Sequence, residues 1–189
     1  MSPIAHASFP PQEGLIEENF LALSQLRHFV GDLAPEHYRQ AFGHHGHHTL
    51  GKHVRHIIDH YDALLSGLEA DGDVIDYERR RRDELLEQWP QQAAQRLAEI
   101  EAALAAAIDR CPSVRLGQTY HVGDRALLLE TSLARELAFL TSHTIHHMAI
   151  LGLLAEQVGI ALPEAFGVHP STLRHWQREA TVPVSARSA

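Results

Sequence analysis

Histidine is the residue type that suggests chemistry in this sequence, with 16 among 189 residues. Imidazole is the commonest metal ligand among side chains. His143 and His147 are four residues apart within an apolar segment. If that segment is a helix, both rings lie on one face, one turn apart, and can bind the same ion. This spacing predicts two ligands of one metal site, although buried histidines that only fill a core are the alternative.

A second apolar segment offers further imidazoles, because His53, His56 and His60 are spaced three and four residues apart. One of these rings would complete a three-nitrogen site that leaves positions open for water or substrate, as metal-assisted catalysis requires. His53 and His60 lie nearer the centre of the apolar stripe than His56 does. The pattern alone therefore leaves the choice of the third ligand open.

Other signals in the sequence are weaker. The histidines His44, His45, His47 and His48 interrupt a glycine-rich stretch, which predicts a solvated loop with incidental metal affinity. Four consecutive arginines, 79–82, predict a solvated segment, with an anion clamp as the alternative. The single cysteine, Cys111, has no activating neighbour and is expected to be inert. Glu-x-x-His, His-Glu-x-x-His, Gly-x-Ser-x-Gly and glycine-rich phosphate motifs are all missing, which argues against di-iron, zincin, serine-hydrolase and phosphate-loop sites.

The elements that would position these residues are helices. Apolar residues recur at helical spacing in four segments, and the stretch before the last of them alternates like a β-hairpin or an extended crossover. The expected helices cover 14–30, 49–68, 90–108 and 131–158, with the hairpin within 113–130. We therefore expect an all-α four-helix bundle with a short β-hairpin before the last long helix. The expected domain spans 13–176, between a flexible arm at 1–12 and a tail at 177–189.

The composition limits the partners of the protein. Acidic residues outnumber basic ones by 24 to 16, giving a formal net charge of −8, which argues against nucleic acid as a partner. The beginning of the sequence lacks the basic and apolar regions of a signal peptide, and its apolar runs are shorter than a membrane helix needs. We expect a cytoplasmic protein that binds neither nucleic acid nor membranes.

Two histidine motifs resemble those of the DinB-like (YfiT-like) metalloenzyme family. They are His53-Val-Arg-His56-Ile-Ile-Asp59 and His143-Thr-Ile-His146-His147. The stretches 130–137 and 166–173 resemble one subgroup of that family. The resemblance covers about residues 14–175.

The resemblance implies that His56, His143 and His147 hold a divalent metal ion, with zinc or nickel expected. It also implies an up-down-down-up four-helix bundle that is often dimeric. Characterised members of the family include thiol-dependent S-transferases and isomerases. His60 or His53 remains the substitute for His56 if the second long helix is rotated.

The function expected from these observations is that of a metal-dependent enzyme. Its tris-histidine site would activate a small thiol or water for transfer or hydrolysis of a small-molecule substrate, and the protein would be a homodimer. Asp59 and Glu136 are weak candidates for an acid or base, so no catalytic residue is assigned. The alternatives are a non-catalytic metal- or ligand-binding bundle, such as a sensor or accessory protein, and a haem-binding bundle.

Overall fold

A computed structural model of the chain describes residues 11–69, 74–79, 81–110 and 115–181. Within these residues the structure has seven helices and three strands. In chain order they are α1 (Pro11–Gly31), α2 (Pro35–Arg39), α3 (Leu50–Glu69), β1 (Val74–Asp76), α4 (Leu85–Gln88), α5 (Pro90–Arg110), β2 (Arg115–Val122), β3 (Arg125–Ser132), α6 (Leu133–Gln157) and α7 (Pro170–Thr181). Cys111 and Arg80 lie outside the described residues.

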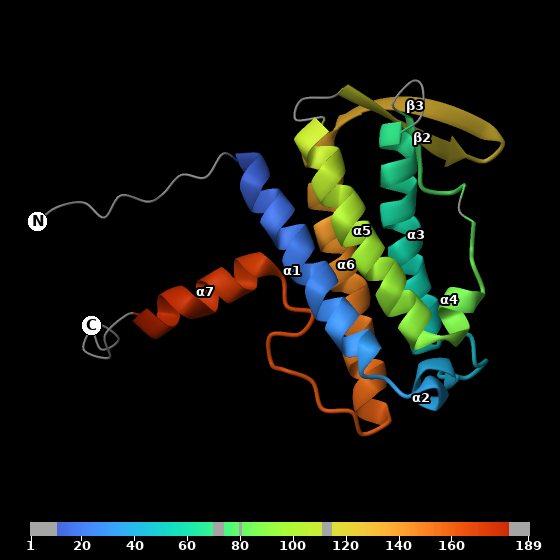
Figure 1. Cartoon of the computed structure of the whole chain (residues 1–189), viewed down its shortest axis with the longest axis vertical. Coiled ribbons are helices and arrows are strands. Elements are labelled where there is room, and N and C mark those ends of the chain that lie inside the picture. Colours follow the sequence, from blue (N-terminus) through green and yellow to red (C-terminus); the bar gives the residue numbers. More distant parts are fainter. Residues whose placement is uncertain (1–10, 70–73, 80, 111–114, 182–189) are drawn as a thin grey trace, which may run out of the picture.

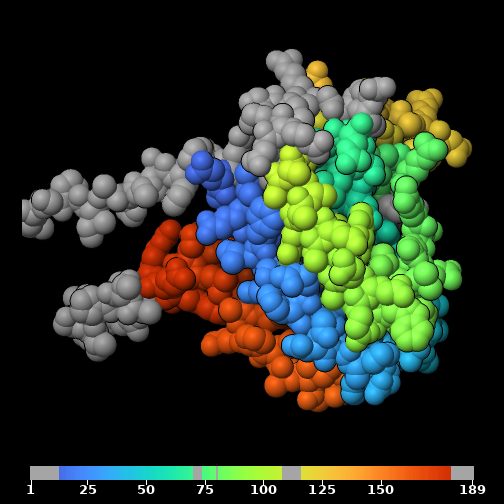
Figure 2. All heavy atoms as spheres, in the orientation of Figure 1, coloured from blue at the N-terminus to red at the C-terminus, as the bar shows by residue number. Residues whose placement is uncertain are grey.

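The four long helices α1, α3, α5 and α6 form the bundle (Figure 1). Both α1 and α3 pack against α5 and α6, which places α1 and α3 on one diagonal of the bundle. In Figure 1, α1 and α6 descend while α3 and α5 ascend, so the connection from α3 to α5 returns along the length of the bundle. Figure 2 shows α1 and α5 side by side at the centre of the face turned to the viewer.

Burial of the apolar stripes explains why α3 and α6 present their histidines to each other. The α3 stripe, predicted from helical spacing, is fully buried at Val54, Ile57, Tyr61 and Leu64. Every apolar side chain removed from water in this way stabilises the bundle by about 1.5–3 kcal/mol. Rotation of α3 about its axis would expose these side chains, so the rotation of the helix, and with it the direction of its imidazoles, is fixed by the core.

The predicted β-hairpin is present, and the structure adds a strand to it. β2 and β3 pair antiparallel through a turn at Gly123 and Asp124, with Gly123 at φ +59°, a conformation that glycine adopts without strain. β1 pairs parallel with β2, which gives a three-stranded mixed sheet in the order β1-β2-β3. The expectation of an all-α fold is therefore corrected to a mostly helical fold with a small sheet. The sequence did not indicate β1 because three residues between charged segments carry no detectable alternation.

The boundaries of the long helices follow the sequence signals closely. Ser132 caps α6, and its hydroxyl accepts a hydrogen bond from the backbone N–H of Arg135 at 3.3 Å. The segment after α6 contains a further helix, α7, which has 12 residues and leans away from the bundle (Figure 1). The division into an arm, a bundle domain and a tail stays a prediction.

α6 is also, by length and composition, apolar enough to cross a membrane. The core helix of a helical bundle meets the same criteria. Here α6 packs against both α1 and α3, and its Leu137, Leu140 and Leu151 belong to the core. The structure therefore accounts for the apolar character of α6 by the packing of its apolar face in the core of the bundle.

Candidate metal centre

The imidazoles of α3 and α6 meet in the interior of the bundle. His56, His60 and His143 each offer one ring nitrogen such that the three nitrogens lie within 4.8 Å of one another. The Nε2 atoms of His56 and His143 are 3.1 Å apart, although 87 residues separate them in the chain. Two nitrogens on one tetrahedral zinc ion, each about 2.0–2.1 Å from the metal, would be about 3.3 Å apart. The observed spacing therefore fits two neighbouring ligands of one ion.

His60 is held in the tautomer that a ligand needs. Its Nδ1 lies 2.8 Å from the backbone carbonyl oxygen of His56, one turn earlier on α3. Because a carbonyl only accepts hydrogen bonds, Nδ1 carries the proton, and the lone pair is on Nε2. Metal-binding histidines are commonly fixed by such a hydrogen bond from their second nitrogen.

His143 is neutral and lacks a partner for one of its nitrogens. Burial, and then the neighbouring imidazoles led by His60, lower the pKa of His143 from 6.5 to about 2. Its Nδ1 is buried and has no hydrogen-bond partner among the described residues. Leaving a buried polar atom unpaired costs about 1–3 kcal/mol, and such an atom in a functional cluster points to a missing ligand or water. The converging Nε2 atoms and the all-imidazole donor set fit a bound divalent ion, which would leave this Nδ1 as a protonated donor.

His147, the third ligand implied by the family resemblance, lies beside this cluster. Its ring centre is 4.5 Å from that of His56 and 4.6 Å from that of His143. Its Nδ1, however, lies 3.1 Å from Nδ1 of His53. The structure thus brings His56, His143 and His147 together, while the three nitrogens that converge belong to His56, His60 and His143. The assignment of His147 as a ligand stays a prediction.

Two aromatic residues that the sequence did not indicate form a wall of the cluster. Tyr77, just after β1, stacks on His60 with ring centres 5.4 Å apart, and Phe139 on α6 lies 5.6 Å from His143. The two aromatic rings also contact each other at 5.2 Å. Phe139 precedes His143 by one helical turn, so helical spacing could have identified it. Tyr77 follows a short strand in a charged connector and gave no signal.

The two carboxylates considered as an acid or base are engaged in other contacts. Asp59 accepts a hydrogen bond from Arg55 one turn earlier on α3. The fully buried Glu136 accepts hydrogen bonds from Tyr77 at 2.7 Å, Thr131 at 2.5 Å and Arg135 at 2.9 Å. Burial and the neighbouring Glu136 raise the pKa of Tyr77 above its usual range. These contacts give both carboxylates a structural role, and the catalytic residue stays unassigned.

The histidine-rich loop lies closer to the cluster than the sequence indicated. Its four histidines are exposed, as predicted for a solvated loop. The loop is closed by a hydrogen bond from the Phe42 N–H to the His48 carbonyl at 2.8 Å, with Gly43 and Gly46 at positive φ. His48 nevertheless stacks on His53, with ring centres 5.5 Å apart and planes at 8°. The loop is therefore continuous with the imidazoles of α3.

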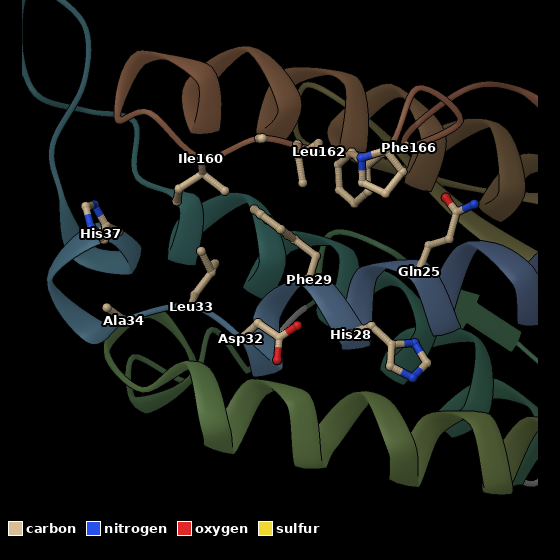
Figure 3. Close-up of a pocket in the computed structure, with 12 residues that line it drawn as sticks. Gln25, His28, Phe29, Asp32, Leu33, Ala34, His37, Ile160, Leu162 and Phe166 are labelled. Atoms are coloured by element: carbon tan, nitrogen blue, oxygen red, sulfur yellow. The ribbon is translucent and has the colours of Figure 1, made fainter.

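A separate cavity of about 480 Å³ lies between the end of α1, α2 and the segment after α6 (Figure 3). Its apolar lining includes Phe29, Leu162 and Phe166, and Figure 3 shows Asp32 and His37 among its polar groups. The cluster imidazoles of α3 and α6 are not among the residues that line it. The cavity and the candidate metal centre are thus different places in the fold.

Comparisons with known proteins agree with the helical fold of the chain. The fold is similar to the crystal structure of a DinB-like protein from Bacillus cereus ATCC 10987, with a TM-score of 0.57 and 18% sequence identity over 80% of this chain and 95% of that one. The chain is also 28% identical over 109 residues to FK506-binding protein 5 of Rhizopus delemar, covering 56% of this chain. It spans only 28% of the length of that curated relative. The model of the DinB superfamily matches residues 21–151, and the chain therefore belongs to the DinB superfamily.

Proposed function

We propose that this protein is a divalent-metal-dependent enzyme that activates a small thiol or water for a transfer or hydrolysis reaction. The convergence of ring nitrogens from α3 and α6 carries the proposal, because imidazole nitrogens at this spacing suit zinc or nickel. A divalent ion on neutral imidazoles keeps its full charge and lowers the pKa of a thiol or water near it.

The residues of the chain prepare the site for such an ion. Burial keeps His143 neutral, so that protons do not compete with a metal for the lone pair of its unprotonated ring nitrogen at neutral pH. The carbonyl of His56 orients His60 through its Nδ1. Tyr77 and Phe139 cover one side of the cluster with apolar surface, which limits the access of water there and strengthens electrostatic interactions.

We propose His56 and His143 as two of the three ligands. The third is either His147, which the family resemblance implies, or His60, which the nitrogen positions favour. Isothermal titration calorimetry measures the zinc affinity of His143→Ala, His60→Ala and His147→Ala. These affinities distinguish the two alternative sets of ligands. Loss of a direct ligand is expected to weaken the tight site by 100-fold or more, since even indirect partners contribute about 10–100-fold. His175→Ala, on the exposed surface of α7, is the matched control. Unchanged affinity in His143→Ala would refute the site.

Catalysis is tested with the metal-loaded protein, a low-molecular-weight thiol and an electrophilic acceptor. The rate of thiol consumption is expected to depend on the metal and to disappear in His143→Ala. Full metal occupancy without any turnover of thiols or hydrolysable esters would instead favour a non-catalytic metal-binding bundle. A small-molecule substrate, a homodimeric state and a cytoplasmic location belong to the proposal as well, and sedimentation velocity measures the oligomeric state.

A further inference from the structure

We propose that the free edge of β3 pairs antiparallel with the β3 edge of a second copy of this chain, across a two-fold axis at Leu128. The two three-stranded sheets then join into one. This pairing gives the homodimer of the proposed function its contact surface. It rests on that homodimeric state and not on the metal centre or on catalysis.

β3 is an outer strand that lies open to solvent in the part of the chain that the structure describes. The sheet order β1-β2-β3 leaves one side of β3 without a neighbouring strand. Every residue of β3 is exposed apart from Thr131, which is half-buried. In Figure 1 the tip of the hairpin extends beyond α3, so a second chain has access to this edge.

The register of the hairpin determines which backbone groups point to the free edge. Val122 and Arg125 flank the two-residue turn and are directly paired. Residues that flank such a turn exchange two backbone hydrogen bonds, and along an antiparallel ladder hydrogen-bonded pairs alternate with non-bonded ones. Every second residue of β3, beginning with Arg125, therefore turns its N–H and C=O groups toward β2. The residues between them turn these groups toward the free edge, and they include Ala126, Leu128 and Glu130.

One register joins these groups of two identical strands best. The residue on a two-fold axis faces its own copy, so it must be one whose backbone groups point to the edge. An axis at Glu130 would set two carboxylates opposite each other, and an axis at Ala126 would overlap little more than the residues next to the turn. An axis at Leu128 aligns residues 125–131 of both copies. Arg125 then faces Thr131, and Ala126 faces Glu130, so that no like charges are opposed.

The side chains at this edge also favour association. Leu127, Leu128 and Leu129 are 46%, 69% and 43% exposed. In the Leu128 register, Leu128 faces its own copy on one side of the sheet, and Leu127 faces Leu129 of the second copy on the other side. Opposed apolar side chains stabilise a strand pair. Protected edge strands carry lysine, proline or a bulge, whereas residues 125–132 contain neither lysine nor proline and pair with β2 without a bulge.

The size of the contact sets its expected strength. β3 has eight residues, whereas a standard protein interface has about 20–30 residues on each side. We therefore expect a dimer that dissociates on dilution.

Sedimentation velocity of the full-length protein tests the edge with two matched variants. Leu128→Arg places a charge on the proposed axis, where it would face the same charge of the second copy. Leu153→Arg makes the same change at a leucine of α6 that is 64% exposed. Wild type and Leu153→Arg should dimerise with the same concentration dependence, and the dimer of Leu128→Arg should be weaker by at least about tenfold. Circular dichroism checks the fold of both variants.

Two further measurements report the register. Leu128→Cys in a Cys111→Ser background should form a disulfide with its own copy under mild oxidation, because the Cα atoms of a hydrogen-bonded pair lie about 5.5 Å apart. Leu153→Cys in the same background should not. Amide exchange followed by NMR should be slower in the dimer than in the monomer at Ala126, Leu128 and Glu130, whose N–H groups gain an acceptor there. Equal crosslinking of both cysteine variants would contradict the register.

The outcomes separate this edge from other modes of association. A monomer at every concentration between about 1 μM and 1 mM would overturn both the edge contact and the homodimer of the proposed function. A dimer that Leu128→Arg leaves unchanged, or that Leu153→Arg weakens equally, would overturn the edge contact while the homodimer stands. The zinc affinity of His143→Ala tests the metal centre separately from both.

Discussion

The Nε2 atoms of His56 and His143 lie 3.1 Å apart because α3 and α6 pack side by side with their histidine faces turned inward. This contact joins residues 87 positions apart in the chain. Since an ion bound between the two residues would join the two helices, metal binding and the stability of the bundle should be linked.

Zinc is therefore expected to raise the Tm of the protein. A ligand that binds only the folded state adds stability that grows with the logarithm of its concentration, about 4 kcal/mol at 1,000 times its Kd. Differential scanning fluorimetry with increasing zinc measures the shift. His143→Ala should show a much smaller shift, while His175→Ala should behave as wild type. An equal shift in all three proteins would contradict the link.

The metal-free protein should lose stability in mild acid. The pKa values of His53 and His147 are lowered to about 4 and that of His143 to about 2, while the unfolded chain takes up these protons near pH 6.5. Between pH 6.5 and 4 the unfolded state binds more protons, so stability rises with pH in this window and levels off above it. Tm measured from pH 4 to 7.5 checks this. His53→Asn should give a shallower rise, and a Tm that falls with rising pH would refute the explanation.

Removing the hydroxyl of Tyr77 should destabilise the fold without affecting metal binding. Tyr77→Phe deletes the hydrogen bond of 2.7 Å to the fully buried Glu136, at an expected cost of about 1–3 kcal/mol. The ring that stacks on His60 remains, so zinc affinity should change less than threefold. Urea denaturation and calorimetry measure the two quantities. Tyr120→Phe, at a half-exposed position of β2, is the control, and an equal loss of stability there would undermine the role of Glu136.

Alanine at two helical glycines should have opposite effects. A Cβ at Gly51, near the start of α3, would lie 2.2 Å from the backbone oxygen of Glu87. Such a contact forces the backbone to move, so Gly51→Ala should cost about 1–3 kcal/mol despite the better helix propensity of alanine. At Gly152 on α6, the nearest atoms are 3.9 Å away, and Gly152→Ala should stabilise by about 0.5–1 kcal/mol. Chemical denaturation measures the free energy of unfolding of both variants. Stabilisation by Gly51→Ala would contradict the packing of α3 against α4.

The sequence by itself determined the local elements of this protein. The apolar stripe of α3 and the Ser132 cap of α6 are local signals, because helix formation depends on residues three and four apart. The same spacing identified His143 and His147 as neighbours on one face. The alternation in the segment before α6 likewise indicated the hairpin.

Only the tertiary structure decided which residues of different elements meet. The direction of each imidazole of α3 depends on how the core sets the rotation of that helix, which placed the nitrogens of His60 beside those of His56 and His143. Tyr77 reaches His60 from a connector, and His48 reaches His53 from a loop, through contacts that no local periodicity encodes. Helical spacing specifies a face of a helix, whereas the packing of the whole bundle decides what that face contacts.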